Sequence, residues 1–131
     1  MDEKNTYKIV YIEDDSEMID LVSLILNRQG YQVSGANGGR AGLDLVKRNS
    51  PDLILLDLMM PDIDGWDVYQ QLRSNEETRD IPVIVITAKS QMIDRVLGLH
   101  IAKVDDYISK PFKPVELIES VTRILNRKSE G

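Results

Sequence analysis

Two hydrophobic periods alternate along this chain, and their alternation predicts five strands, each followed by a helix. Short, nearly continuous apolar runs are typical of strands that are buried on both faces of a sheet. Between these runs, apolar residues recur every three or four positions, which places them on one face of a helix. The expected strands are residues 8–12, 31–36, 53–56, 81–86 and 106–109, and the expected helices are residues 16–29, 41–49, 64–74, 93–101 and 117–125.

Repeated strand–helix units of this kind favour one fold class. They build a mostly parallel sheet with helices on both faces. We therefore expect an α/β protein with a (βα)5, doubly wound, five-stranded parallel sheet.

The third expected strand delivers a carboxylate to the edge of the sheet. Residues 53–56 are all apolar, and the run stops at Asp57. Pro61 and the Asp64-Gly65 pair that follow are typical of a loop that leads into a helix. Ligands of open α/β sheets bind at the carboxyl ends of the strands. Asp57 is therefore a candidate nucleophile.

Length and composition favour one globular domain over residues 1–131, with a core at about 7–125 and a polar tail at 126–131. Hydrophobic residues make up 42% of the chain, and the absence of cysteine excludes disulfides and thiolate chemistry. No apolar stretch reaches the ~20 residues that span a bilayer, and the N-terminus does not resemble a signal peptide. We expect a cytoplasmic protein without membrane contact, and the net charge of −6 argues against direct nucleic-acid binding by this domain.

Polar side chains collect where the other expected strands end. Glu13 and Asp14 follow the first strand, Thr87 follows the fourth and Lys110 follows the fifth. In a parallel sheet these residues meet Asp57 at one edge. Three carboxylates repel one another unless a cation lies among them, and oxygen ligands alone favour Mg²⁺ over Ca²⁺ or Mn²⁺. The set suits phosphoryl transfer to a carboxylate, with the hydroxyl and the ammonium contacting phosphoryl oxygens.

Four motifs in order resemble a known family. They are Ile-Glu-Asp-Asp at 12–15, Asp-Leu-Ile-Leu-Leu-Asp-Leu-Met-Met-Pro at 52–61 followed by Asp64-Gly65, Val-Ile-Thr-Ala at 85–88, and Asp-Asp-Tyr-Ile-Ser-Lys-Pro-Phe at 105–112. Over roughly residues 7–125 the chain resembles the CheY-like receiver domain of response regulators in bacterial two-component signalling. The resemblance implies a flavodoxin-like strand order, 2-1-3-4-5.

The resemblance also implies a role for each residue at the sheet edge. Asp57 would accept a phosphoryl group from a phosphohistidine on a sensor histidine kinase or a histidine phosphotransfer protein. Mg²⁺ would be bound by Asp14, Asp57 and the backbone carbonyl of Met59, with Glu13 acting directly or through water. Such a domain assists its own phosphorylation and dephosphorylation, and it is a signalling phosphoacceptor rather than an enzyme.

A switch is implied as well. Lys110 would contact the phosphoryl group, next to a cis peptide bond to Pro111. Thr87 would move toward the phosphate, and Tyr107 would turn inward behind it. The change would be read on the face made by the fourth helix, the fifth strand and the fifth helix, through an output partner that the sequence does not identify or through a homodimer.

Met59 and Lys89 are expected to tune the lifetime of the signal, and the segment 101–104 departs from the common pattern of the family. In the family, Met59 and Lys89 flank the path of the water that hydrolyses the phosphoryl group. An apolar side chain at Met59 cannot orient that water, so we expect a long-lived phosphoryl group. The segment 101–104 has no glycine and is one residue longer than usual, which predicts a different end for the fourth helix.

Simpler explanations exist for single residues. A strand-end carboxylate or threonine is often a helix cap, an acidic run after a strand suits a helix dipole, and an aromatic residue in a strand usually belongs to the core. The alternative function is a receiver-like interaction module that is not phosphorylated. A dehalogenase-type phosphatase would need an acid at Met59, and in a flavodoxin-like electron carrier the acidic run 13–17 would repel the cofactor phosphate.

Overall fold

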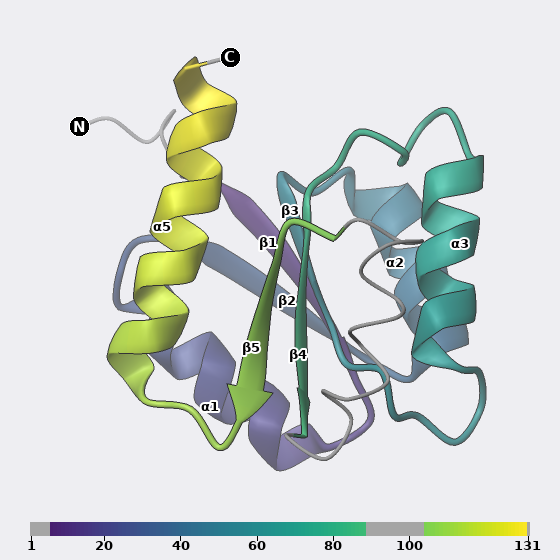
Figure 1. Cartoon of the computed structure of the whole chain (residues 1–131), viewed down its shortest axis with the longest axis horizontal. Helices are drawn as coiled ribbons and strands as arrows, with labels where there is room; N and C mark the ends of the chain where they lie inside the picture. The colour runs from purple at the N-terminus through teal and green to yellow at the C-terminus, as the bar shows by residue number, and fades with distance from the viewer. Residues whose placement is uncertain (1–5, 89–103, 131) are drawn as a thin grey trace.

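The computed structural model describes residues 6–88 and 104–130, with side chains described as far as Arg127. The strands are β1 (Lys8–Glu13), β2 (Gln32–Asn37), β3 (Leu53–Leu56), β4 (Val83–Ala88) and β5 (Asp106–Lys110). The described helices are α1 (Ser16–Asn27), α2 (Gly39–Asn49), α3 (Gly65–Ser74) and α5 (Pro114–Glu130) (Figure 1). The helix predicted at 93–101 lies outside the described residues.

All five strands are parallel and form one sheet in the order β2-β1-β3-β4-β5. This confirms the predicted fold class and strand order. β3 lies between β1 and β4, because its residues pair with both. The residue that follows β3 therefore emerges at the centre of the carboxyl edge.

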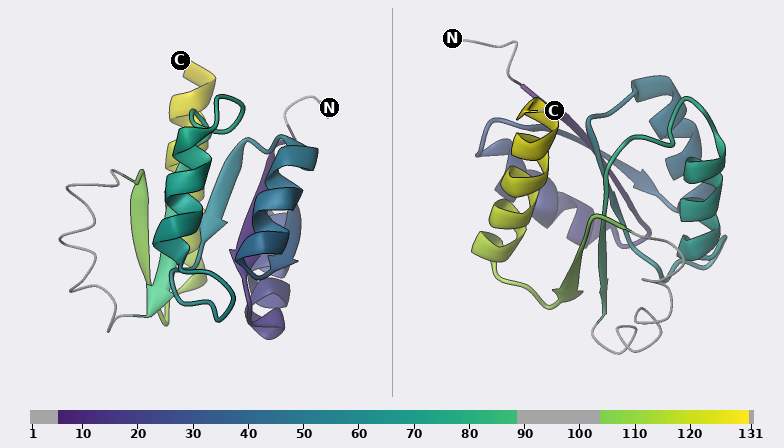
Figure 2. Two further views of the ribbon diagram at one scale, coloured as in Figure 1. Left: turned by 90° about the vertical axis from the view of Figure 1, so that its right-hand side faces the viewer. Right: turned by 45° about the horizontal axis from the view of Figure 1, so that its top comes forward.

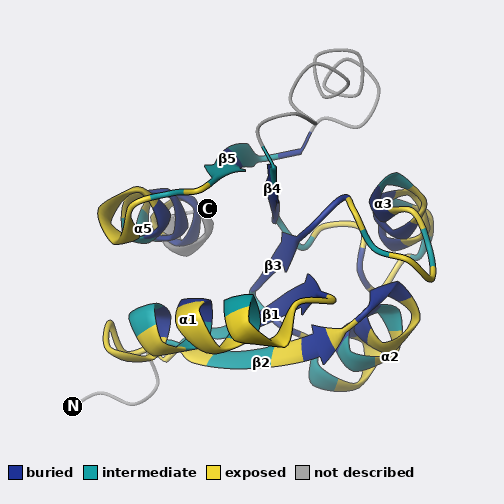
Figure 3. Ribbon diagram, turned by 90° about the horizontal axis from the view of Figure 1, so that it is seen from below, coloured by how far each residue is buried: buried dark blue, intermediate teal, exposed yellow. Residues whose placement is uncertain are grey.

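Helices cover both faces of the sheet. α1 and α5 pack on one face, and α2 and α3 pack on the other (Figure 3). The right-hand view in Figure 2 shows the twisted sheet as the middle layer between these helix pairs. Alternate residues of β3 enter different cores: Leu53 and Leu55 pack with α1 and α5, and Ile54 and Leu56 pack with α2 and α3. The four-residue apolar run is explained by burial on both faces.

Several element boundaries differ from the prediction, and two of the differences have a clear structural reason. β4 begins at Val83 rather than Ile81, because the N–H of Ile81 bonds to the Thr78 carbonyl and closes the turn after α3. The polar residues predicted as a tail continue α5 to Glu130. One contact that holds this last part is the 2.9 Å ion pair between Arg127 and Asp105.

Asp105 joins three elements at the amino edge of the sheet. Its carboxylate accepts the backbone N–H of Val83 at 2.8 Å and pairs with Arg127 on α5. Arg73 on α3 lies 3.6 Å from the same carboxylate. The first acid of the 105–112 motif is thus a structural tie on the side opposite the predicted site. Among the described residues, no helix is long and apolar enough to cross a membrane.

Candidate functional site

The carboxyl edge brings four predicted residues together. Glu13 ends β1, Asp57 directly follows β3, Thr87 is the last residue but one of β4, and Lys110 ends β5. Glu13 is 1% exposed, Asp57 is 3% exposed and Thr87 is fully buried. Ionisable side chains with so little solvent contact are costly unless they are paired. Their presence indicates a site that was built at the expense of stability.

Lys110 is shared between two carboxylates. Its Nζ donates to Glu13 Oε1 at 2.7 Å and lies 3.7 Å from Asp57 Oδ2. Glu13 also accepts the Tyr11 hydroxyl at 2.7 Å and the Asp15 backbone N–H at 3.3 Å. Burial alone would raise the pKa of Glu13, but the hydrogen bonds and charge of Lys110, together with Tyr11, hold that pKa below its ordinary value. Glu13 is therefore the ionised partner of Lys110.

Asp57 has the opposite balance. Burial, and then the negative charge of Glu13, raise the pKa of Asp57 from 3.8 to about 7. Lys110 and the backbone N–H of Met59 act in the other direction but do not compensate. Among the described residues, one ammonium thus serves two buried acids, and Asp57 binds a proton near neutral pH. A second cation at this place would release that proton.

The donor set fits a hard divalent cation. Carboxylate oxygens of Glu13, Asp14 and Asp57 lie within 4.8 Å of one another, and Asp14 is exposed to solvent. Within the described chain, Thr87 Oγ1 is buried and has no hydrogen-bond partner. Three carboxylates, a solvent-facing opening and an unused hydroxyl fit Mg²⁺ with a further oxygen ligand. Mg²⁺ itself, and the Met59 carbonyl as its ligand, remain predictions.

The acidic run after β1 divides into two parts. Asp15 is the N-cap of α1, because its carboxylate accepts the N–H groups of Glu17 and Met18. Glu13 and Asp14 take no part in that cap and face the site instead. Helix capping therefore accounts for the second half of the run only.

The start of α3 presses against the backbone next to the candidate nucleophile. Asp64 caps the helix by accepting the N–H of Trp66 at 2.8 Å. A Cβ at Gly65 would lie 2.4 Å from Leu58 Cα and 2.7 Å from the Asp57 carbonyl oxygen. Only glycine allows this approach, which explains the Asp64-Gly65 pair and fixes the backbone after Asp57.

The remaining predicted residues are placed as follows. The Lys110–Pro111 peptide bond is cis, the conformation that the resemblance implies. Met59 is 56% exposed on the loop after β3. Tyr107 is half-buried on β5 and packs against the α2–α3 core, opposite β4. Lys89 lies outside the described residues, as does most of the fourth-helix part of the predicted switch face.

Sequence reasoning missed two polar contacts near the site. Tyr11 belongs to the buried core, and its hydroxyl donates to Glu13, two residues away on the same face of β1. Burial and the charge of Glu13 raise the pKa of Tyr11, so the hydroxyl stays a donor. Asp62 lies on the loop after β3, and its carboxylate accepts the backbone N–H groups of Gly39 and Arg40 at the start of α2. The alternation of side chains along a strand could have predicted the contact between Tyr11 and Glu13, because residues two apart share a face. No local pattern in the sequence marks the contact of Asp62 with α2.

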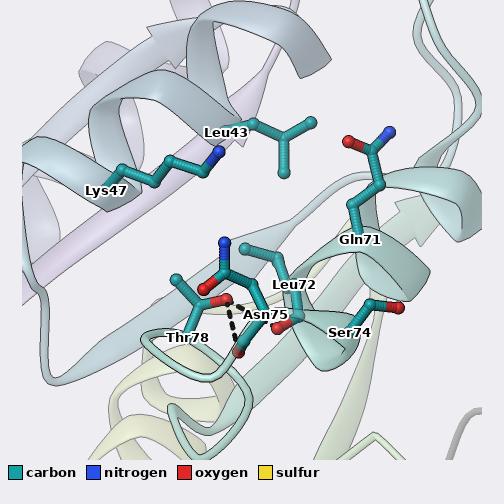
Figure 4. Close-up of a pocket in the computed structure, with 7 residues that line it drawn as sticks. All are labelled: Leu43, Lys47, Gln71, Leu72, Ser74, Asn75 and Thr78. Carbon is teal, nitrogen blue, oxygen red and sulfur yellow. Dashed lines mark hydrogen bonds between the residues drawn. The ribbon is translucent and has the colours of Figure 1, made fainter.

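A hollow of about 270 Å³ between α2 and α3 is a separate feature (Figure 4). Leu43 and Lys47 from α2 face Leu72 and Thr78 across it, and Thr78 Oγ1 donates to the Leu72 carbonyl at 2.6 Å. It shares no residue with the acidic cluster and contains no carboxylate. It therefore offers no competing site for this chemistry.

Comparison with known sequences identifies relatives. The sequence model described as response regulator receiver domain matches residues 9–122. The DNA-binding dual master transcriptional regulator RpaA of Synechocystis is 43% identical over 92% of this chain and 49% of its own length. The regulatory protein VanRc of Enterococcus gallinarum is 38% identical over 92% of this chain and 50% of its own length. The chain thus spans about half the length of these curated relatives.

Solved structures agree with the sequence comparison. A CheY-like response regulator receiver domain protein from Methanospirillum hungatei superimposes with a TM-score of 0.86 at 26% identity, covering 97% of this chain and 100% of that one. The signal receiver domain of a signal transduction histidine kinase from Syntrophus aciditrophicus has a TM-score of 0.84 at 34% identity, covering 92% and 91%.

The metal-free protein should lose stability through Asp57 as the pH rises. The pKa of Asp57 is about 7 in the folded chain against an ordinary value of 3.8. The penalty for ionising Asp57 is therefore absent below about pH 4, grows between about pH 4 and 7, and is complete above about pH 7. We expect Asp57→Asn to increase the free energy of unfolding by about 1–3 kcal/mol at about pH 8, and by less as the pH falls.

Urea unfolding in the presence of a chelator, followed by circular dichroism across this pH range, measures the effect. Asp44→Asn is the matched control, because Asp44 is exposed on α2 and pairs only with the exposed Arg48 among the described salt bridges. Its effect should stay within about 0.5 kcal/mol at every pH. An Asp57→Asn protein that is no more stable than wild type at about pH 8 would contradict the raised pKa.

Proposed function

Because the chain belongs to the response regulator receiver domain family, we propose that it is the phosphoacceptor of a two-component or phosphorelay system. The phosphoryl group would pass from a phosphohistidine on a sensor histidine kinase, or on a histidine phosphotransfer protein, to Asp57. The observation that carries this proposal is the buried Asp57 carboxylate, 3.7 Å from Lys110 Nζ and within a three-acid cluster. Such a domain is a signalling phosphoacceptor in the cytoplasm rather than an enzyme.

Mg²⁺ is the cofactor that the site residues fit. Asp14, Asp57 and the Met59 carbonyl would bind it, with Glu13 acting directly or through water. When bound, Mg²⁺ supplies positive charge to the phosphoryl oxygens during transfer. Glu13 already accepts a hydrogen bond from Lys110 Nζ at 2.7 Å, so its main contribution is to hold that ammonium in place.

The chain's own residues account for the transfer. An ionised Asp57 oxygen forms a bond to phosphorus while the bond from phosphorus to the imidazole nitrogen breaks, and the electron pair of that bond stays on nitrogen. Lys110 neutralises charge on one phosphoryl oxygen. Thr87 Oγ1, which has no partner among the described residues, gains an acceptor when a phosphoryl oxygen arrives.

The same hydroxyl is the start of the proposed switch. Thr87 lies on β4, and Tyr107 lies on the neighbouring strand β5, opposite Val85. A shift of Thr87 toward the phosphate would therefore change the space open to the tyrosine ring. The outcome would be read by an output partner or a second copy of the chain on the face of β5, α5 and the fourth-helix region. If the phosphate contacts Thr87 in only one of the two packings, it shifts the equilibrium toward that packing.

Phosphorylation is tested directly with acetyl phosphate and Mg²⁺. We expect the wild-type protein to gain the mass of one phosphoryl group, and a chelator to abolish the gain. Asp57→Asn should gain nothing, because the attacking oxygen is gone, whereas Asp44→Asn should behave as wild type. Lys110→Ala should react about tenfold more slowly or worse, since it loses the cation that faces the phosphoryl oxygens.

Intact-mass spectrometry and the fluorescence of Trp66, the single tryptophan, follow the reaction and the binding of beryllofluoride. A wild-type protein that neither gains mass nor responds to beryllofluoride would favour an interaction module that is not phosphorylated. Mass gain that persists in Asp57→Asn would place the acceptor elsewhere.

The phosphoryl group should be long-lived because of Met59. Its exposed side chain has no group that can orient a water molecule for attack on phosphorus. We expect Met59→Asn, which adds a hydrogen-bonding amide, to hydrolyse severalfold faster, and Met59→Leu to match wild type. Loss of mass after removal of acetyl phosphate gives the rates. Hydrolysis of the wild-type acyl phosphate within seconds in Mg²⁺ would contradict this prediction; Lys89 is expected to tune the same step.

A further inference from the structure

The start of α2 is capped by a carboxylate from a distant loop. Its N-cap residue, Gly38, has no side chain, and its φ of 117° suits glycine. Asp62 supplies the missing cap: Oδ1 accepts the N–H of Gly39 at 3.0 Å, and Oδ2 accepts the N–H of Arg40 at 3.1 Å. These bonds, from Arg40 first and then Gly39, lower the pKa of Asp62. The cap is therefore ionised at neutral pH, as a helix N-terminus favours.

Close packing between the same loop and the start of α2 adds to these hydrogen bonds. A Cβ at Gly39 would lie 1.9 Å from Ile63 Cγ2 and 2.9 Å from Val68 Cγ2. Ile63 thus occupies the place of a side chain at the first residue of α2. The hollow shown in Figure 4 lies farther along α2, at Leu43 and Lys47. The loop after β3 is therefore held against α2 at the start of the helix, outside the hollow.

The loop that Asp62 anchors also contains the atoms next to Asp57. The Met59 N–H bonds to the Asp57 carboxylate, and the Met59 carbonyl is a proposed Mg²⁺ ligand. On one side of Met59 the chain is fixed in the sheet, because the Asp57 N–H bonds to the Ile12 carbonyl at 3.0 Å. On the other side it is fixed where the Gly65 N–H bonds to the Leu58 carbonyl at 3.1 Å. Met59 and Asp62 between these points are exposed, so packing alone fixes them weakly.

We propose that Asp62 is a positioning residue for the phosphoacceptor site: by tying the loop after β3 to the start of α2, it fixes the Met59 backbone beside Asp57. This inference rests on the proposed function. Removal of the tie would leave Asp57, Asp14 and Lys110 in place while freeing the Met59 backbone. Asp62 would then affect metal binding and phosphoryl transfer without contacting either ligand.

The test compares Asp62→Ala and Asp62→Asn with wild type. Asp62→Ala should weaken Mg²⁺ binding, measured by isothermal titration calorimetry, by about tenfold, and it should slow the mass gain from acetyl phosphate to a similar extent. Asp62→Asn keeps one acceptor oxygen, so its Mg²⁺ affinity and its rate should lie between those of wild type and Asp62→Ala. It is the variant to measure if Asp62→Ala does not fold. Asp52→Ala is the control, because Asp52 also accepts a backbone N–H, from Lys8 at 2.8 Å, at the opposite edge of the sheet.

Thermal unfolding separates positioning from simple helix capping. The inference is supported if both Asp62 variants lose Mg²⁺ affinity and rate at a temperature where they are folded, while Asp52→Ala keeps both. It is overturned if the Asp62 variants lose thermal stability alone and bind Mg²⁺ as wild type does. Wild-type protein that binds no Mg²⁺ and gains no phosphoryl group would overturn the proposed function as well, so the two failures are distinguishable.

Discussion

Among the described residues, two buried carboxylates, Glu13 and Asp57, share the ammonium of Lys110. Lys110 Nζ is 2.7 Å from Glu13 Oε1 and 3.7 Å from Asp57 Oδ2. The ammonium therefore neutralises Glu13 first, and the Asp57 carboxylate is left under-neutralised. Desolvation makes this arrangement expensive, and at short distances in a medium of low polarity like charges repel strongly. The consequence is a carboxyl group that binds a proton near neutral pH and has room for a cation instead. The proposed metal binding, the proposed nucleophilicity of Asp57 and the expected cost in stability follow from this one imbalance.

The fold maintains the imbalance because its parts are rigid where the charges lie. Glu13 and Lys110 are the last residues of strands, and Asp57 follows a strand that is buried on both faces. The backbones that carry these three side chains therefore cannot move apart without disturbing the sheet. Gly65 and Asp62 hold the loop beyond Asp57 in two further places, against the backbone of Leu58 and against the start of α2. Stability is given up at the edge and recovered in the two cores, as is typical of functional sites.

The sequence predicted the features that follow from local patterns. Apolar runs predicted the strands, and the common direction of the strands predicted that Glu13, Asp57 and Lys110 meet. Which acid binds Lys110 could not be predicted, because it depends on the final packing of residues 97 positions apart. The Asp62 cap is also long-range, and α2 carries no sign of it beyond a glycine at the N-cap. The start of β4 was misplaced because a turn that closes on Thr78 takes up Ile81, which a hydrophobic pattern cannot distinguish from strand.

If Asp57 gives up its proton when a cation reaches the acid pair, Mg²⁺ binding releases protons. Calorimetric titration of the wild-type protein with Mg²⁺, in buffers that differ in enthalpy of ionisation, counts the protons released on binding. With the pKa of Asp57 at about 7, we expect release of roughly half a proton at about pH 7 and close to none at about pH 9. Mg²⁺ binding without proton release at about pH 7, or no Mg²⁺ binding at either pH, would contradict it.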